Sequence, residues 1–216
     1  MAKFVELFSN LLAKNLREPK GITGYFILGN LRKVNRVLEA NAVQQLDIQP
    51  NDNVLEVGFG PGVGLNAALK KVEQGSGKVY GIDISEQVVR QAKKNFKSSI
   101  ERQKLQIDLG SVMELPYDDN FFDRVFHVNC YYFWPDLDQG ISELRRVMKT
   151  EGLMVTTLVE DSLNMCADKG LLKYGPHWSP EVYIAKLSQA GFTNVSMETK
   201  KTKSGFAFQV IHASKK

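Results

Sequence analysis

A glycine-rich segment holds the residues whose spacing most clearly indicates chemistry. An acidic residue and three glycines alternate there: Glu56, Gly58, Gly60 and Gly62. Glycine lets the backbone turn sharply and lets a ligand approach the main chain closely. The dinucleotide-binding pattern G-x-G-x-x-G is not met, because Val63 or Leu65 stands where the third glycine would be required. The segment therefore predicts a ligand-binding loop of another kind.

A second acidic residue, Asp83, ends the next apolar run, 25 residues after Gly58. That is roughly the interval at which an acid accepts hydrogen bonds from the ribose of a bound nucleotide. A carboxylate suits this role because it offers acceptors to both vicinal hydroxyls. The alternative is an aspartate that caps the following helix, but Ser85 is already available as that cap. We therefore expect Asp83 to bind a ribose.

The segment after the fourth apolar run holds residues that can contact a second substrate. His127 and Tyr132 are the candidate catalytic groups, because an oxygen or carbon acceptor can need a base near the reacting atoms. His127 alternates with apolar neighbours, so a packed, hydrogen-bonded histidine is the competing interpretation. Tyr131, Tyr132 and Trp134 form an aromatic cluster that can bind an apolar or cationic acceptor, or pack in the core.

The elements that must position these residues alternate between strands and helices. Strands are predicted at residues 53–57, 78–82, 104–109, 122–128, 153–159, 195–199 and 206–212. Helices are predicted at residues 3–16, 24–46, 63–72, 85–97, 137–148 and 179–190. This alternation indicates βαβ units, and the last two strands lack a helix between them. The predicted fold is α/β, a Rossmann-like seven-stranded, mostly parallel sheet with an antiparallel last strand and helices on both faces.

The composition excludes several classes of protein. The net charge of +4 is only mildly basic, and the lysines among residues 200–216 are interpreted as a solvated rim, so a nucleic-acid partner is not expected. Two cysteines outside any CxxC pair, and three histidines without ligand spacing, indicate neither a disulfide framework nor a metal site. No apolar run reaches the length of a membrane span. We expect a cytoplasmic protein that is a monomer or a homodimer.

In order and spacing, these motifs resemble those of the class I S-adenosylmethionine-dependent methyltransferases. The closest likeness is to the small-molecule branch with the ubiquinone and menaquinone C-methyltransferases. The resemblance covers residues 50–160, including the acid–glycine loop, Asp83, residues 110–117, residues 122–129 and residues 143–149 with Gly152. It implies S-adenosylmethionine as the cofactor and S-adenosylhomocysteine as its product.

The resemblance also implies which residues contact that cofactor. They are Glu56, Gly58, Gly60, Gly62, Asp83, Ile84, Val112 and Asn129. Ile84 is expected on the adenine face, with Val112 beside it. Ser111 stands where the family usually has an acid, so its adenine contact is left open. The segment from Asn129 lacks the prolines of the (D/N)-P-P-(Y/F) motif, which disfavours a DNA-base or glutamine target.

We predict one domain with three parts. Residues 1–48 form an N-terminal helical cap, residues 50–160 the cofactor-binding core, and residues 161–216 an acceptor-side helix with the C-terminal hairpin. The N-terminal helices fit a lid, which would bring Tyr25 toward the substrate. Residues 171–178 are the other expected wall of the acceptor site.

Three functions remain open at this point. The first is methyl transfer to a small-molecule acceptor, such as a metabolite, a lipid-like molecule or a quinone-like ring. The second keeps the cofactor and takes RNA or protein as the acceptor, which the mild basicity alone supports. The third is a non-catalytic S-adenosylmethionine-binding partner protein. A dehydrogenase is disfavoured by the glycine spacing.

Overall fold

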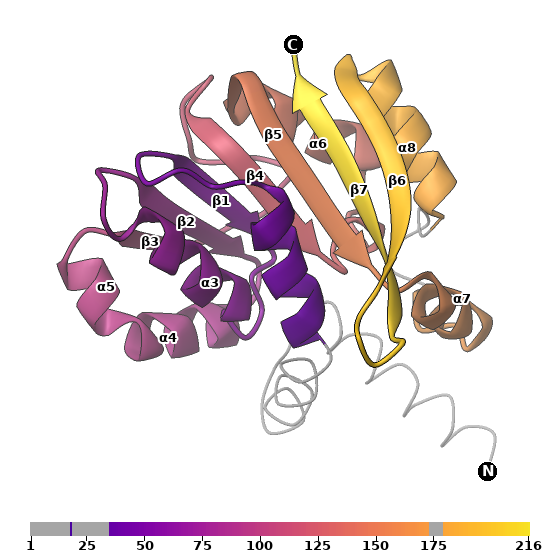
Figure 1. Cartoon of the computed structure of the whole chain (residues 1–216), viewed down its shortest axis with the longest axis horizontal. Helices are drawn as coiled ribbons and strands as arrows, with labels where there is room; N and C mark the ends of the chain where they lie inside the picture. Colours follow the sequence, from indigo (N-terminus) through magenta and orange to yellow (C-terminus); the bar gives the residue numbers. More distant parts are fainter. Residues whose placement is uncertain (1–17, 19–34, 173–178) are drawn as a thin grey trace.

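A seven-stranded sheet organises the chain. The coordinates are a computed structural model that describes residue 18, residues 35–172 and residues 179–216. The strands are β1 (Asn53–Val57), β2 (Lys78–Asp83), β3 (Leu105–Leu109), β4 (Phe122–Val128), β5 (Met148–Leu158), β6 (Phe192–Lys201) and β7 (Ala207–Lys215). Their order is β3-β2-β1-β4-β5-β7-β6 (Figure 1). β1 to β5 pair in parallel and β7 is antiparallel to both of its neighbours, which confirms the predicted sheet.

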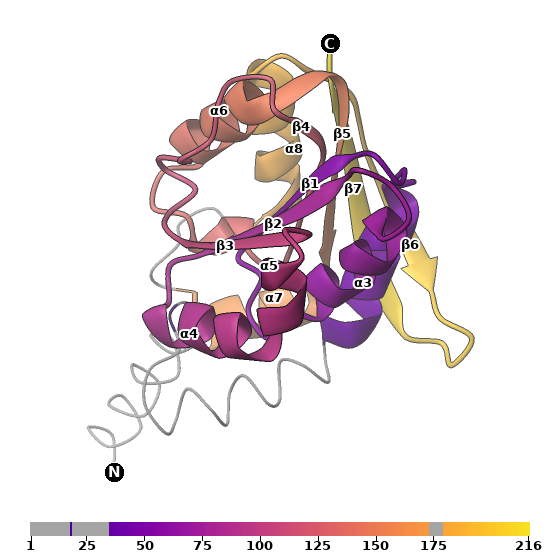
Figure 2. The ribbon, with the colours of Figure 1, turned by 90° about the vertical axis from the view of Figure 1, so that its left-hand side faces the viewer.

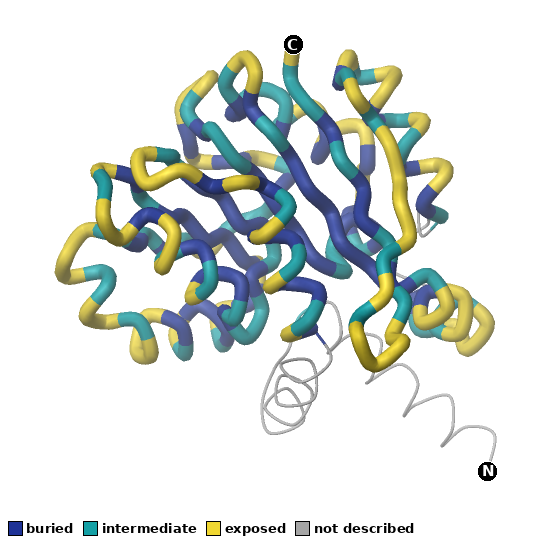
Figure 3. The backbone as a smooth tube through the Cα atoms, viewed as in Figure 1, coloured by how far each residue is buried: buried dark blue, intermediate teal, exposed yellow. Residues whose placement is uncertain are grey.

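Helices cover both faces of this sheet. They are a helix over residues 35–45, α3 (Val63–Val72), α4 (Glu86–Asn95), α5 (Lys97–Glu101), the 3₁₀ turn η1 (Tyr131–Phe133), α6 (Leu137–Val147), α7 (Glu160–Asp168) and α8 (Pro180–Gln189). One apolar core joins helix 35–45, α3 and α4 to the sheet, and a second joins α6, α7 and α8 to it. Figure 2 shows α6 and α8 on one side of the sheet and α3 on the other. The central strands lie buried between the two layers (Figure 3).

The elements around the glycine loop follow from local sequence. β1 is a five-residue apolar run that is buried beyond its first residue, and α3 begins directly after the loop. Ser85 caps α4, since its hydroxyl accepts a hydrogen bond from the Val88 N–H. α8 ends before Gly191, whose φ of 86° is the left-handed conformation that glycine allows at a helix C-terminus. These predicted boundaries are confirmed.

The predicted start of β5 is wrong by five residues. The helix expected over residues 137–148 is confirmed within one residue, since α6 ends at Val147, but β5 already begins at Met148 and not at residue 153. Met148 pairs with Phe122 at the start of β4, and the chain then turns within β5, where Glu151 has a φ of 64°. Pairing with β4 therefore starts the strand earlier than its own sequence indicates.

Some predicted elements lie outside the described residues. They include the helix over residues 3–16, the first part of the helix over residues 24–46, and Tyr25 with the expected lid. The last part of that second helix is described and runs from residue 35 to residue 45. In residues 18, 35–172 and 179–216, no helix is long and apolar enough to cross a membrane.

Candidate functional site

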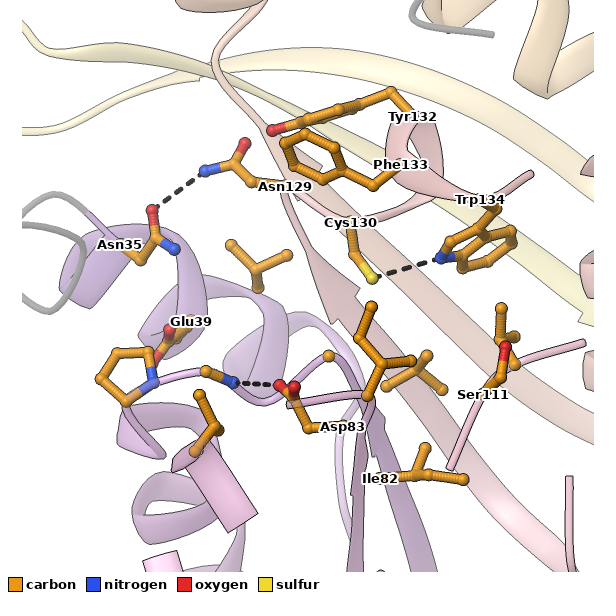
Figure 4. Close-up of a pocket in the computed structure, with 18 of the residues that line it drawn as sticks. Asn35, Glu39, Ile82, Asp83, Ser111, Asn129, Cys130, Tyr132, Phe133 and Trp134 are labelled. Carbon is orange, nitrogen blue, oxygen red and sulfur yellow. Dashed lines mark hydrogen bonds between the residues drawn. The ribbon is translucent and has the colours of Figure 1, made fainter. Parts of the chain in front are cut away.

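A pocket of about 250 Å³ opens at the carboxyl ends of β1, β2 and β4. This is the crevice where α/β sheets bind their ligands. Predicted site residues that line it are Gly58, Gly60, Asp83, Ile84, Val112, Asn129, Tyr132 and Trp134. Figure 4 shows Asp83 at one side of the pocket and Asn129, Tyr132 and Trp134 on the segment that follows β4. The structure therefore brings together residues from four separate segments of the chain.

The backbone of the glycine loop forms one wall of the pocket. Gly58 and Gly60 have φ values of 67° and 46°, which non-glycine residues seldom adopt. The Gly58 N–H donates to the Ile82 carbonyl over 2.8 Å, which ties the loop to β2. A Cβ atom added to Gly58 would lie 2.6 Å from Cys130 Sγ, so the loop and the segment after β4 are in close contact. Gly62 caps α3 and does not line the pocket.

Asp83 connects the glycine loop to the end of β2. Its Oδ2 accepts from the Gly60 N–H over 3.0 Å, and its Oδ1 accepts from the Ser85 N–H over 2.9 Å. Burial raises the pKa of this carboxyl to about 6, although those backbone hydrogen bonds oppose the rise. Each oxygen keeps further acceptor capacity toward the pocket, as contact with two vicinal hydroxyls requires.

If the Asp83 carboxylate accepts from the cofactor as the sequence predicts, cofactor binding should weaken in acid. Binding that requires the ionised form is complete above the pKa of about 6 and is lost as the pH falls through it. We expect an affinity about tenfold lower one pH unit below that pKa, measured by calorimetric titration with S-adenosylhomocysteine. Circular dichroism at each pH checks that the fold is intact. An affinity that stays constant from neutral pH to about pH 5 would contradict this role of Asp83.

Two further carboxyl groups lie near Asp83. Glu56 is 2% exposed, lies behind the glycine loop rather than in the pocket wall, and its Oε2 has no hydrogen-bond partner among the described residues. Its pKa is raised by burial first, then by the charges of Glu39 and Asp83. Glu39, also 2% exposed, comes from helix 35–45 and lines the pocket. The two carboxyl groups in the pocket wall, those of Glu39 and Asp83, favour a cationic ligand.

Asn35 and Glu39 are pocket residues that the sequence did not reveal. Asn35 lies one turn before Glu39, and its Oδ1 accepts from Asn129 Nδ2 over 3.0 Å (Figure 4). This contact joins residues 94 positions apart in the chain. The one local signal was polar residues at helical spacing beside the buried Leu38 and Ala42.

The pocket wall formed by the residues after β2 and β3 is more apolar. Ile84 is 36% exposed at its rim and Val112 is buried in its wall, so both can pack against a planar ring. Ser111 lines the pocket as well, and its hydroxyl accepts from the Met113 N–H over 3.2 Å. The Ser111 hydroxyl still has its own proton to donate.

The structure does not bring His127 or Tyr131 into the pocket wall. His127 is fully buried, and its Nε2 lies 2.8 Å from the Tyr183 hydroxyl and 2.9 Å from the Thr156 hydroxyl. Burial lowers the pKa of His127 to about 3, so the ring is neutral near pH 7. Tyr131 stacks on Tyr183 with ring centroids 4.2 Å apart. Both side chains therefore pack between the sheet and α8.

Tyr132 and Trp134 do line the pocket, from η1 and the residue after it. The Trp134 indole N–H donates to Cys130 Sγ over 3.3 Å (Figure 4). Burial raises the pKa of the Tyr132 hydroxyl well above its usual range. Tyr132 is thus protonated near neutral pH and can act as a hydrogen-bond donor. In residues 18, 35–172 and 179–216, no group of histidine, cysteine and acidic side chains could hold a metal ion.

The sheet is mostly parallel and has one reversed strand, β7. The glycine loop that follows Glu56 and the carboxylate of Asp83 meet at the same crevice. Together these features are typical of Rossmann-like transferases. The known proteins agree, since residues 55–156 match the methyltransferase domain family. Residues 55–156 thus form a class I S-adenosylmethionine-dependent methyltransferase domain, and its cofactor is S-adenosylmethionine.

Two related proteins and one solved structure illustrate this relationship. The uncharacterized methyltransferase YdaC of Bacillus subtilis (strain 168) is 29% identical over 182 residues, which cover 84% of this chain and 92% of that protein. Demethylmenaquinone methyltransferase of Desulfitobacterium hafniense (strain Y51) is 31% identical over 116 residues, 53% of this chain and 45% of that protein. The structure of a SAM-dependent methyltransferase from Aquifex aeolicus aligns with a TM-score of 0.65 at 21% identity, covering 87% of this chain and 97% of that one.

Proposed function

We propose that the protein transfers the methyl group of S-adenosylmethionine to a small, largely apolar molecule. The observation that carries this proposal is the composition of one end of the pocket, the acceptor end. It is lined by Tyr132, Phe133, Val159, Ser162, Leu163, Cys166 and Leu172. None of these side chains carries a charge at neutral pH, whereas the carboxyl groups gather at the other end. The demethylmenaquinone methyltransferase among the related proteins supports an apolar ring as the acceptor.

The pocket residues fit the cofactor chemically. Asp83 would accept the ribose hydroxyls, and Gly58 and Gly60 would let the cofactor lie against the main chain. Ile84 and Val112 would pack on the adenine. S-adenosylmethionine supplies an electrophilic methyl group on a positively charged sulfur.

The acidic end of the pocket suits the cationic part of this cofactor. Glu39 lines the pocket near Asp83 and would stabilise both the sulfonium and the ammonium of the methionine portion, whereas Glu56 lies behind the glycine loop and has a raised pKa. Asn129, held by Asn35, would fix the position of the same portion. The product S-adenosylhomocysteine has lost the sulfonium charge, so these carboxyl groups would bind it less tightly than the substrate.

Tyr132 is the proposed acceptor-positioning residue. It lines the acceptor end and its raised pKa keeps the hydroxyl protonated, so it can donate a hydrogen bond to the acceptor but cannot remove a proton. His127 is neutral and buried against Tyr183, outside this wall. A pocket without a base at its acceptor end suits acceptors whose attacking atom is already nucleophilic. The carbon of an electron-rich ring is an example. Orientation alone can contribute about 7–11 kcal/mol to such a transfer.

Replacing His127 by glutamine should lower stability and leave the pH profile of methyl transfer unchanged in shape. The variant disturbs the hydrogen bonds to Tyr183 and Thr156, which should reduce the free energy of unfolding by about 1–3 kcal/mol. Urea denaturation and initial rates across the pH range measure the two effects. If the variant stays folded but loses the acidic limb of the rate profile, where a required base becomes protonated, His127 would instead be a general base.

The function is tested by transfer of a labelled methyl group to separate acceptor pools. Quinol-type rings, lipid-like acids, purified RNA and protein are each incubated with the enzyme and labelled S-adenosylmethionine. We expect label in a quinol-type or lipid-like molecule and none in the macromolecules. Asp83→Asn is the negative control and Asp118→Asn, an exposed carboxylate away from the pocket, is the matched positive control. Label in RNA or protein alone would overturn the proposed acceptor class.

A further inference from the structure

A second cleft lies at the end of the sheet opposite the cofactor pocket. It has a volume of about 620 Å³ and is formed by α6, the C-terminal end of α8, the loop before β4 and the last residues of β7. These elements meet near the C-terminus in Figure 1. Polar side chains that line this distal cleft include Asn120, Ser142, Arg145, Gln189 and Lys215. It shares no lining residue with the cofactor pocket.

Arg145 is the least satisfied cation of the distal cleft. Its Nε is buried and has no hydrogen-bond partner, and no carboxylate of the described chain lies within ion-pair distance of it. The neighbouring Arg146 differs, because its guanidinium binds Asp119 over 2.8 Å and Glu143 over 2.7 Å. The Arg145 guanidinium rests instead against the backbone of Gly191, where an added Cβ would lie 3.4 Å from Nε. A buried guanidinium donor without an acceptor is costly, so its presence calls for an explanation.

A second cation, Lys215, faces the same cleft. Its Nζ donates to Asn120 Oδ1 over 2.8 Å and to the Met148 carbonyl over 2.7 Å, both of them neutral acceptors. The pKa of Lys215 is lowered by burial and then by the charge of Arg145, which places the two cations near one another, while the charge of Asp119 opposes the fall. Asp119 thus offsets part of the Lys215 charge, but its own ion pair is with Arg146.

The carboxylates of the distal cleft are already engaged by other cations. Asp119 pairs with Arg146, and Asp138 pairs with Lys186 over 2.7 Å. Arg145 and Lys215 thus form a pair of like charges, and neither is ion-paired with a carboxylate of the described residues. Like-charged side chains at a surface usually move apart into solvent. Here the buried Arg145 Nε and the two hydrogen bonds of Lys215 keep the two side chains in place.

We propose that the distal cleft binds an oxyanion of the phosphate type, held by Arg145 and Lys215 with the Ser142 hydroxyl beside them. The planar guanidinium presents parallel N–H donors that match two phosphate oxygens, and Lys215 adds a point charge. Ser142 lies one helical turn before Arg145 on α6 and is exposed, so its hydroxyl is on the same side of the helix. The site is separate from the methyl-transfer pocket and does not rest on the acceptor proposed above.

Phosphate binding is measured by calorimetric titration and thermal unfolding with inorganic phosphate at constant ionic strength. Sodium chloride provides the reference, and glycerol 3-phosphate distinguishes a phosphate ester from the free ion. We expect both phosphates to raise the unfolding temperature above the chloride reference. Arg145→Gln should weaken binding about tenfold or more, because it removes a charge-assisted pair of hydrogen bonds. The phosphate affinity of Arg145→Lys should lie between those of the wild type and Arg145→Gln, since lysine keeps the charge and loses the planar guanidinium.

The control is Arg102→Gln, which removes an exposed arginine at the end of α5, outside the distal cleft. Each variant is also titrated with S-adenosylhomocysteine. Its affinity should be unchanged, which would show that the variant is folded. Ser142→Ala, on the solvent side of α6, supplies a second, milder test of the same site. Equal phosphate binding by the wild type, Arg145→Gln and Arg102→Gln would overturn the proposal, as would stabilisation no larger than that by chloride.

Discussion

Replacing Asp83 by asparagine should weaken the binding of S-adenosylmethionine at least a hundredfold. In the wild type each carboxylate oxygen accepts one backbone hydrogen bond, from Gly60 or from Ser85, and keeps acceptor capacity for the pocket. An asparagine has one acceptor oxygen and one amide nitrogen that only donates. It must therefore leave one of those N–H groups without its acceptor and cannot accept from both ribose hydroxyls. Losing one or two charge-assisted hydrogen bonds costs about 3–4 kcal/mol, which is a factor of about 10²–10³ in affinity.

Calorimetric titration with S-adenosylmethionine and S-adenosylhomocysteine measures this loss. Both ligands carry the ribose, so both should lose affinity in the Asp83→Asn variant. Asp118→Asn removes an exposed carboxylate of the same kind from the loop before β4 and should bind normally. Circular dichroism of the Asp83→Asn variant checks that β2 and the loop remain folded. A loss of affinity no larger than about threefold in folded protein would show that Asp83 serves the loop and not the ligand.

The core of the cofactor site was predictable because its signals are local. A buried five-residue strand, a glycine loop and a helix start follow one another without interruption, and β1 and α3 have the predicted bounds. The carboxyl end of β2 then had to lie beside this loop, since consecutive parallel strands end at the same edge of a sheet. The Gly60–Asp83 hydrogen bond is the physical outcome of that adjacency.

Other parts depend on contacts between segments that are distant in the chain. Asn35 and Glu39 reach the pocket only because helix 35–45 packs on the sheet beside β1, and no local pattern specifies that position. The surroundings of His127 also depend on a distant segment. Its position in β4 predicts on which face of the sheet the side chain lies, but the sequence does not show that Tyr183 of α8 packs on that face. The short α5, η1 and α7 were not predicted, because a few residues of mixed polarity give no helical period.

Replacing Gly58 by alanine should destabilise the protein and abolish cofactor binding, for two separable reasons. The φ of 67° is a left-handed conformation that costs an L-residue about 1–2 kcal/mol. The new Cβ would also lie 2.6 Å from Cys130 Sγ, so the loop and the segment after β4 must move apart. Overpacking of this kind costs about 1–3 kcal/mol more. The displacement falls at the wall that the cofactor must contact, so affinity should fall together with stability.

Cys130→Ala separates the two causes, because it removes the sulfur that the new methyl group would meet. Cys130→Ala also removes the sulfur that accepts from the Trp134 indole N–H, so the double variant Gly58→Ala/Cys130→Ala is compared with Cys130→Ala alone. Cys130 Cβ lies 3.6 Å from the added atom, which is an ordinary contact, so in that comparison only the backbone strain remains. Gly205→Ala is the matched control for that strain. Its φ is 85° and nothing lies within 4 Å of an added Cβ, so it should lose only about 1–2 kcal/mol in urea denaturation. If Gly58→Ala costs no more in the Cys130→Ala background than Gly205→Ala costs in the wild type, and the double variant regains part of the affinity for S-adenosylhomocysteine, contact between loop and cysteine accounts for the difference. If Gly58→Ala is no worse than Gly205→Ala, or if removing the sulfur restores nothing, the close contact between Gly58 and Cys130 does not control the shape of the cofactor site.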